Sequence, residues 1–248
     1  MSQRGNEAAI GFNSLLWQPS VTLDASSGDP DALRSGRTGE RWAPDDATPT
    51  LTVSGYGTQA ITYLAIVAHT LGSNGVTVTA ETGSGQVLLE ASPEEDDTLM
   101  ALFPATTAGE ITITLSGPAE IGVVMLGEAL RMERRIYGGH APARLHQQYG
   151  TIVSNGGNAY LGQIQRWSSV VTEFAWANLT TDFVREDLRE FRDYFDSGRP
   201  FVVSWRPLTW PDEAVYCWRS GDPMQITNSG PRDLMSARIS VEGYDGDA

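Results

Sequence analysis

Residues 61–68 read ITYLAIVA, and this stretch decides what kind of fold the chain can adopt. A strand with one wet face alternates apolar and polar residues, whereas this one is apolar almost throughout. We therefore expect a core strand that is covered on both faces or lies central to its sheet.

Two other stretches have the alternating pattern that residues 61–68 lack. Residues 76–80 read VTVTA and residues 111–115 read ITITL, so apolar side chains face one way and threonines the other. This period of two is typical of antiparallel strands with one buried face. The pattern favours a β-sandwich.

Further β-prone runs surround these stretches, separated by clusters of Gly, Pro, Asp and Ser. Together they predict seven strands, at residues 50–54, 61–68, 76–81, 87–91, 99–103, 110–116 and 120–126. Seven short strands with scarcely any helical periodicity predict a jelly-roll-like sandwich in the first half of the chain.

The character of the sequence changes after residue 130. Arg131, Arg134 and Arg135 are followed by GGHAP at residues 138–142, a basic and turn-rich passage. Such passages separate domains. We predict two domains, residues 1–132 and residues 133–248.

One helix is predicted in the second domain, at residues 181–197. Val184, Leu188, Phe191 and Phe195 form an apolar stripe along one face. The capping rules predict that the helix begins after Thr180 or Thr181, either of which is a suitable N-cap, and that it ends at Gly198, which can adopt a left-handed conformation.

Strands are expected on both sides of this helix, at residues 162–172, 173–177, 201–205, 215–218 and 236–241. The second domain is therefore predicted to be α+β. The chain as a whole is expected to be mainly β.

Charge and composition exclude several classes of function. The chain has 17 basic and 31 acidic side chains, a formal charge of −14, which repels nucleic-acid phosphates. Its longest apolar run, near residues 121–126, is far shorter than the roughly 20 residues that cross a bilayer. The polar start predicts no secretory signal.

Residue patterns for chemistry are also missing from the sequence. The chain lacks a nucleophile elbow, a phosphate loop and metal-ligand spacing among its three histidines. Cys217 lies in an apolar stretch and is expected to be a buried hydrophobe, and His69 a structural histidine bonded to a loop carbonyl. We expect no catalytic residue, cofactor or metal, and hence no enzyme.

Aromatic residues beside polar loops are compatible with a sugar-binding site. Trp42 borders loops in which Asp24, Arg37 and Asp45 could bond sugar hydroxyls while the indole ring stacks on the sugar. Core packing of the tryptophan is the favoured interpretation. The aspartates of these loops could also hold calcium, but a solvated loop is favoured because they lack the spacing of a calcium loop.

The sequence resembles two kinds of phage structural domain. Residues 63–72 and 75–78, with residues 24–27, 33–36 and 41–42, resemble discoidin-like, galactose-binding-like jelly rolls. Residues 201–207 and 214–218 resemble the C-terminal domains of bacteriophage tail-tip and distal tail proteins. Distal tail proteins usually have these domains in the opposite order.

The resemblance implies a small β-barrel with a flanking helix in the second domain, and a structural role in a phage tail. It implies a homo-oligomeric ring that joins the tail tube to hub or fibre proteins, in a virion made in the bacterial cytoplasm. Arg206, Trp210 and Arg232 are the expected assembly contacts, since Arg and Trp are enriched at interface centres. Core packing is an equally open interpretation of Trp210.

Two other hypotheses stay open on the sequence. The first is a carbohydrate-binding module for host adhesion, anchored to the virion by the second domain. The second is an enzyme such as a glycan depolymerase, motivated by the many carboxylates and the aromatic residues in loops.

Overall fold

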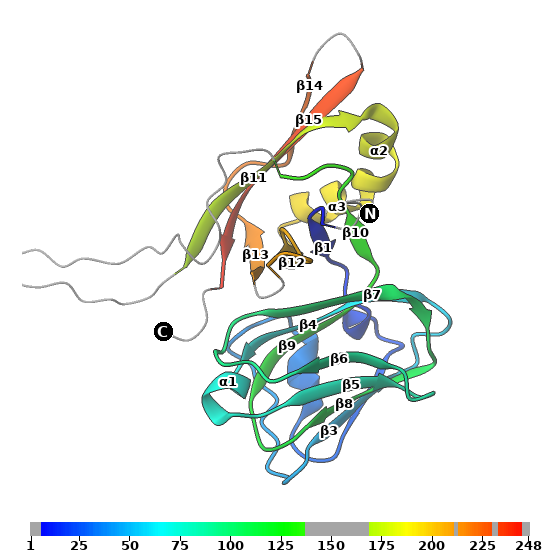
Figure 1. Cartoon of the computed structure of the whole chain (residues 1–248), viewed down its shortest axis with the longest axis vertical. Helices are drawn as coiled ribbons and strands as arrows, with labels where there is room; N and C mark the ends of the chain where they lie inside the picture. The colour runs from blue at the N-terminus through cyan, green and yellow to red at the C-terminus, as the bar shows by residue number, and fades with distance from the viewer. Residues whose placement is uncertain (1–5, 137–168, 211–212, 230–232, 245–248) are drawn as a thin grey trace, which may run out of the picture.

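The computed structural model describes residues 6–136, 169–210, 213–229 and 233–244. Within these residues the chain is mainly β (Figure 1). They form a jelly-roll-like sandwich and an α+β unit, the two kinds of unit that the sequence predicts, so the predicted fold class is confirmed.

Two antiparallel sheets form the jelly roll. The five-stranded sheet has the order β2-β3-β8-β5-β6, which is Thr22–Ala25, Thr50–Ser54, Glu110–Leu115, Val78–Thr82 and Val87–Ala91. The three-stranded sheet has the order β7-β4-β9, which is Leu99–Thr107, Ala60–His69 and Ile121–Gly127. All seven predicted strands are present. The sequence missed β2, whose side chains are half-buried or exposed.

The second unit is built on a seven-stranded sheet. Its order is β10-β1-β12-β13-β15-β11, which is Ala129–Arg131, Ala9–Gly11, Phe201–Ser204, Ala214–Arg219, Leu234–Gly243 and Val170–Thr180. A further strand, β14 (Gln225–Asn228), pairs with β15. Helices α2 (Thr181–Arg185) and α3 (Asp187–Asp196) pack on this sheet.

The jelly roll is inserted between two strands of this second sheet. Strand β1 pairs with β12 on one side and with β10 on the other, with Gly11 opposite Ala129. The chain therefore leaves the sheet at β1, forms the whole jelly roll, and returns beside its point of departure. The predicted division at residue 132 stays a prediction, but the second sheet takes strands from both sides of it.

The three-stranded sheet is buried on both faces. From β4, Leu64 and Ile66 point into the core of the sandwich, whereas Tyr63, Ala65 and Val67 point toward the seven-stranded sheet. Figure 1 shows β7, β4 and β9 between the five-stranded sheet and strands β1, β12 and β13. The prediction of a strand covered on both faces at residues 61–68 is confirmed.

Strands β1, β12 and β13 are likewise covered on both faces. Alternate residues such as Ile10, Phe201 and Cys217 pack toward helix α3, while Val202 and Tyr216 pack toward the jelly roll. The helices, the seven-stranded sheet and the two sheets of the sandwich thus form successive layers.

Tyr63 makes a close contact between the two units. Its hydroxyl donates to the carbonyl of Phe12 at 3.1 Å, and burial raises its pKa. A methyl group on Gly11 would come within 2.5 Å of the Tyr63 ring. A second hydrogen bond runs from the Tyr216 hydroxyl to the Gly36 carbonyl at 2.6 Å.

The predicted helix at residues 181–197 is two helices rather than one. Glu186, with φ −104° and ψ −68°, interrupts it between α2 and α3. The apolar stripe continues across the break, since Val184 and Leu188 are both buried. The Thr180 hydroxyl accepts from the Phe183 amide as an N-cap, and Gly198 has the left-handed φ of 76° that a stop requires.

His69 ends β4 as a buried structural histidine, but its partner differs from the expected carbonyl. Its Nδ1 accepts from the Leu71 amide at 3.3 Å and lies 3.7 Å from a carboxylate oxygen of Asp96. The same oxygen accepts from the Gly72 and Ser73 amides. Burial lowers the pKa of His69 to about 4, against the opposing influence of Asp96.

Gly11→Ala is expected to lower the free energy of unfolding by about 1–3 kcal/mol, the usual cost of overpacking a core. Gly39→Ala is the matched control, because a methyl group there meets nothing within 4 Å. Urea unfolding of both variants measures the difference. Equal stabilities would show that Gly11 and Tyr63 are not in close contact.

The low pKa of His69 predicts a loss of stability in acid. Between pH 6.5 and about pH 4 the unfolded chain binds a proton that the folded chain does not, so unfolding becomes easier as the pH falls. The contribution approaches about 3 kcal/mol below pH 4. Urea unfolding at pH 7.5 and pH 5 should show a smaller pH dependence in His69→Gln than in the unaltered chain; an unchanged dependence would contradict the burial argument.

Candidate functional site

Trp42 lies in the core of the sandwich, which is the interpretation that the sequence favours. Its side chain is fully buried, and its indole N–H donates to the Ser27 carbonyl at 2.8 Å. The ring therefore has no face available to stack on a sugar.

The other predicted sugar-binding residues lie in two places. The Ser27 hydroxyl accepts from the Asp45 amide, and Asp24 lies on the adjoining strand β2, where its side chain is exposed. Arg37 instead forms an ion pair with Glu40 at 2.8 Å. Its neighbour Gly36 is bonded to the second unit, so this loop belongs to the contact between units.

The described residues contain no cluster of three or more His, Cys, Asp or Glu side chains that could hold a metal ion. Cys217 is fully buried, and burial raises the pKa of its thiol well above the usual range. The thiol is therefore protonated and shielded, as the sequence led us to expect.

A cleft of about 810 Å³ opens where the jelly roll meets the helices of the second unit. Four segments line it, and they are residues 12–18 after β1, residues 59–60 at the start of β4, residues 127–131 from the end of β9 through β10, and residues 183–190 of α2 and α3. The volume lies within the roughly 300–1,000 Å³ of small-molecule sites.

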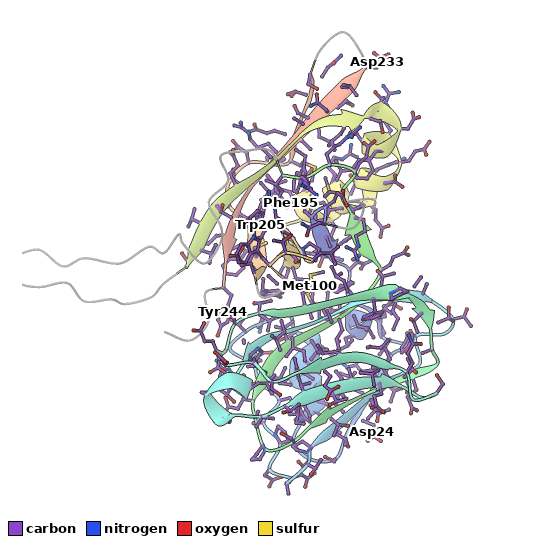
Figure 2. All side chains as sticks on the ribbon, in the orientation of Figure 1. Asp24, Met100, Phe195, Trp205, Asp233 and Tyr244 are labelled. Carbon is purple, nitrogen blue, oxygen red and sulfur yellow. The ribbon has the colours of Figure 1, made fainter. Side chains whose placement is uncertain are left out.

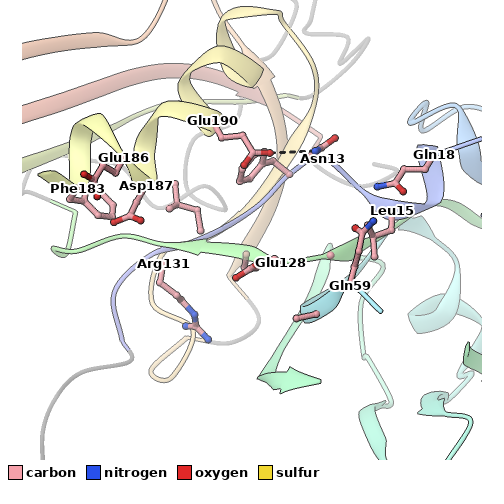
Figure 3. A pocket seen from close by; sticks show the side chains of 15 residues that line it. Asn13, Leu15, Gln18, Gln59, Glu128, Arg131, Phe183, Glu186, Asp187 and Glu190 are labelled. Carbon is pink, nitrogen blue, oxygen red and sulfur yellow. Dashed lines mark hydrogen bonds between the residues drawn. The ribbon is translucent and has the colours of Figure 1, made fainter. Parts of the chain in front are cut away.

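The walls of the cleft are held by hydrogen bonds between these segments. The Ser14 hydroxyl accepts from the Leu16 and Leu126 amides, which fixes the segment after β1 against β9. The Thr62 hydroxyl accepts from the Ala129 amide at 2.8 Å. Across the cleft the Asn13 side-chain amide meets a Glu190 carboxylate oxygen at 3.5 Å (Figure 3).

Polar groups of two kinds occupy opposite ends of the cleft. Figure 3 shows Glu186 and Asp187 at the helical end and the amides of Gln18 and Gln59 at the jelly-roll end, with Glu128 between them. Amides both donate and accept hydrogen bonds, and carboxylates accept. This arrangement suits a ligand that has many hydroxyl groups.

Sequence reasoning missed the cleft because no motif marks it. Its lining comes from segments more than 170 residues apart, such as Asn13 and Glu190. The only sequence feature near the cleft was the polar face of the predicted helix at residues 181–197. Polar residues on a helix are equally typical of a solvated surface.

The predicted assembly residues Arg206 and Trp210 lie on the loop after β12. Trp210 is 50% exposed and Leu208 is 72% exposed, while the Arg206 guanidinium stacks over the Trp205 ring at 4.9 Å. Arg232, the third predicted contact, lies outside the described residues.

None of the helices described is long and apolar enough to span a bilayer.

No protein-family model matches the chain, and no curated protein matches it in sequence. Solved structures match part of it. Two are Clostridium perfringens modules, CpGH89CBM32-6 and CpGH89CBM32-5, the latter in complex with GalNAc-β-1,3-galactose. They are 11% and 14% identical, each at a TM-score of 0.39, covering 46% of this chain and 98% and 99% of theirs.

A Ruminococcus gnavus GH29 fucosidase in complex with fucose also matches, at 14% identity and a TM-score of 0.40, over 49% of this chain and 27% of the fucosidase. The modules are carbohydrate-binding, and the structures named here include no phage tail protein.

The buried thiol of Cys217 should not react with a maleimide reagent in the native protein at pH 8, because the thiolate is the reactive form and burial disfavours it. Mass spectrometry of the labelled chain, with and without urea, measures this. We expect the thiol to be labelled only when urea is present. Rapid labelling of the folded protein would contradict the packing of β13.

Proposed function

We propose that this chain is a non-enzymatic carbohydrate-binding protein, in which the second unit anchors the jelly roll to a larger assembly. One observation carries the proposal, the cleft between the two units. It has the volume of a small-molecule site and is lined by groups that bond hydroxyls.

Preorganisation of the cleft supports binding. The jelly roll is joined to the second sheet by two chain segments and by the packing around Tyr63. The walls of the cleft are therefore fixed before a ligand arrives, which reduces the entropy lost on binding. A small apolar surface from Phe12 and Phe183, each 8% exposed, adjoins the polar groups.

Glycan-array screening followed by titration calorimetry tests the proposal. Gln59→Ala and Glu128→Gln should each weaken binding of the best glycan by about 5- to 10-fold. The first change removes roughly one hydrogen bond, and the second replaces a charge-assisted hydrogen bond by a weaker neutral one. Both residues are exposed, so neither change should alter the fold.

Glu94→Gln is the matched control, because Glu94 is an exposed carboxylate of the jelly roll that does not line the cleft. Its affinity should equal that of the unaltered chain. A silent array, or binding that the cleft variants leave unchanged, would contradict the proposed site. Release of a sugar product would contradict the non-enzymatic assignment.

A second candidate function is that of a structural tail component that forms a homo-oligomeric ring in a bacteriophage virion and contacts tube, hub or fibre proteins. The exposed Leu208 and Trp210 favour it, because large apolar side chains on a surface mark sites of protein contact. The two functions are compatible, since a ring could carry one jelly roll per subunit.

A further inference from the structure

The cleft between the two units carries negative charge that no described residue neutralises. Four acidic residues are among those that line it: Glu128, Glu186, Asp187 and Glu190. The described lining has one basic residue, Arg131. All four acidic residues are exposed, and none of them forms an ion pair with a residue that the structure describes. The cleft is therefore anionic.

The basic residues near the cleft leave this charge in place. Each lining segment is continuous with described residues on both sides, so its neighbours along the chain are known. Arg185 and Arg189 belong to the same helices but do not line the cleft. In Figure 3 the guanidinium of Arg131 points away from the carboxylates of the helices, and the carboxylate of Glu7 attracts its positive charge.

Three of the carboxylates lie within one turn at the start of α3. Glu186 and Glu190 are four residues apart, and like charges at this spacing repel each other. Asp187 adds a third negative charge to the same turn. The dipole of a helix favours acidic side chains in its first turn, so their position alone does not indicate a ligand. The cleft does, because these charges face a cavity of about 810 Å³.

The other end of the cleft is polar but uncharged. Gln18 and Gln59 line it, and their side-chain amides both donate and accept hydrogen bonds. Figure 3 shows these amides at the jelly-roll end, opposite the carboxylates of α3. A ligand that fills the cleft therefore meets acceptors of negative charge at one end and neutral partners for hydroxyls at the other.

We propose that the cleft selects glycans with free amino groups, such as de-N-acetylated hexosamines, over neutral and acidic glycans. The ammonium group would lie among the carboxylates of α3, while ring hydroxyls bond the amides of Gln18 and Gln59. An ammonium group only donates and a carboxylate only accepts, and their charge-assisted hydrogen bonds are about twice as strong as neutral ones. The inference rests on the proposed carbohydrate-binding function and names the class of glycan.

Three ligands of equal length test the selection: a trimer of glucosamine, its N-acetylated form, and a trimer of galacturonic acid. The whole chain is titrated by calorimetry at pH 6, where the sugar amine is protonated. The glucosamine trimer should bind at least about 10-fold more tightly than its N-acetylated form, and the galacturonic trimer most weakly. Raising NaCl from about 0.05 to about 0.5 M should weaken binding of the glucosamine trimer most.

Carboxylate-to-amide variants test whether the cleft makes the selection. Glu186→Gln and Glu190→Gln should each lower the preference for the glucosamine trimer by at least about 3-fold, because a neutral hydrogen bond replaces a charge-assisted one. The double variant should remove the preference. Asp24→Asn is the matched control, since Asp24 is exposed and lies on the side of the jelly roll away from the second unit (Figure 2). It should keep the preference.

Urea unfolding of each variant ensures that a lost preference is not a lost fold. If the tightest ligand lacks a free amine, or if the preference survives the double variant or disappears in Asp24→Asn, the inference is wrong, while glycan binding itself would still support the proposed function. If no glycan binds, the proposed function fails together with the inference.

Discussion

The burial of the three-stranded sheet β7-β4-β9 on both faces is the constraint on which the rest of the molecule depends. Its inner face completes the core of the jelly roll, and its outer face packs on β1, β12 and β13 through Tyr63, Val67 and Val123. Without the second unit this outer face would be an apolar surface in water, at roughly 25 cal/mol for each Å² exposed. The jelly roll and the second unit are therefore expected to be stable only together.

The insertion between β1 and β10 follows from the same constraint. The chain passes between the two units twice, after β1 and before β10. Because these two strands are adjacent, the two crossings place the outer face of β4 directly over the second sheet. Gly11 is required at this point because the Tyr63 ring occupies the space of a side chain. The cleft lies beside these crossings, so its walls belong to both units and its shape depends on their fixed relation.

Local patterns in the sequence predicted most of the strands. The period of two at residues 76–80 and 111–115 indicated strands with one buried face. Its absence at residues 61–68 indicated a strand buried on both faces. Such a pattern could not predict which strand an isolated three-residue strand pairs with. Residues 9–11 are too short to have a period, and their pairing with β12 spans almost 200 residues.

The candidate sites were harder to predict, for a physical reason. A tryptophan beside polar loops has the same local sequence whether its ring faces the core or the solvent, and Trp42 faces the core. The assembly role expected of Arg206 and Trp210 rests on composition alone and stays a prediction, although Trp210 is exposed. The cleft depends on the relative position of segments remote in sequence, which no local pattern records.

The rigid union of the two units is the central claim, and native-state hydrogen exchange tests it most directly. If the three-stranded sheet joins the units, the most protected amides of β4, β9, β12 and β13 should exchange through one global opening with a common free energy. Exchange of β12 and β13 through a separate opening of lower free energy, with β4 and β9 still protected, would show that the units are independent and contradict this account.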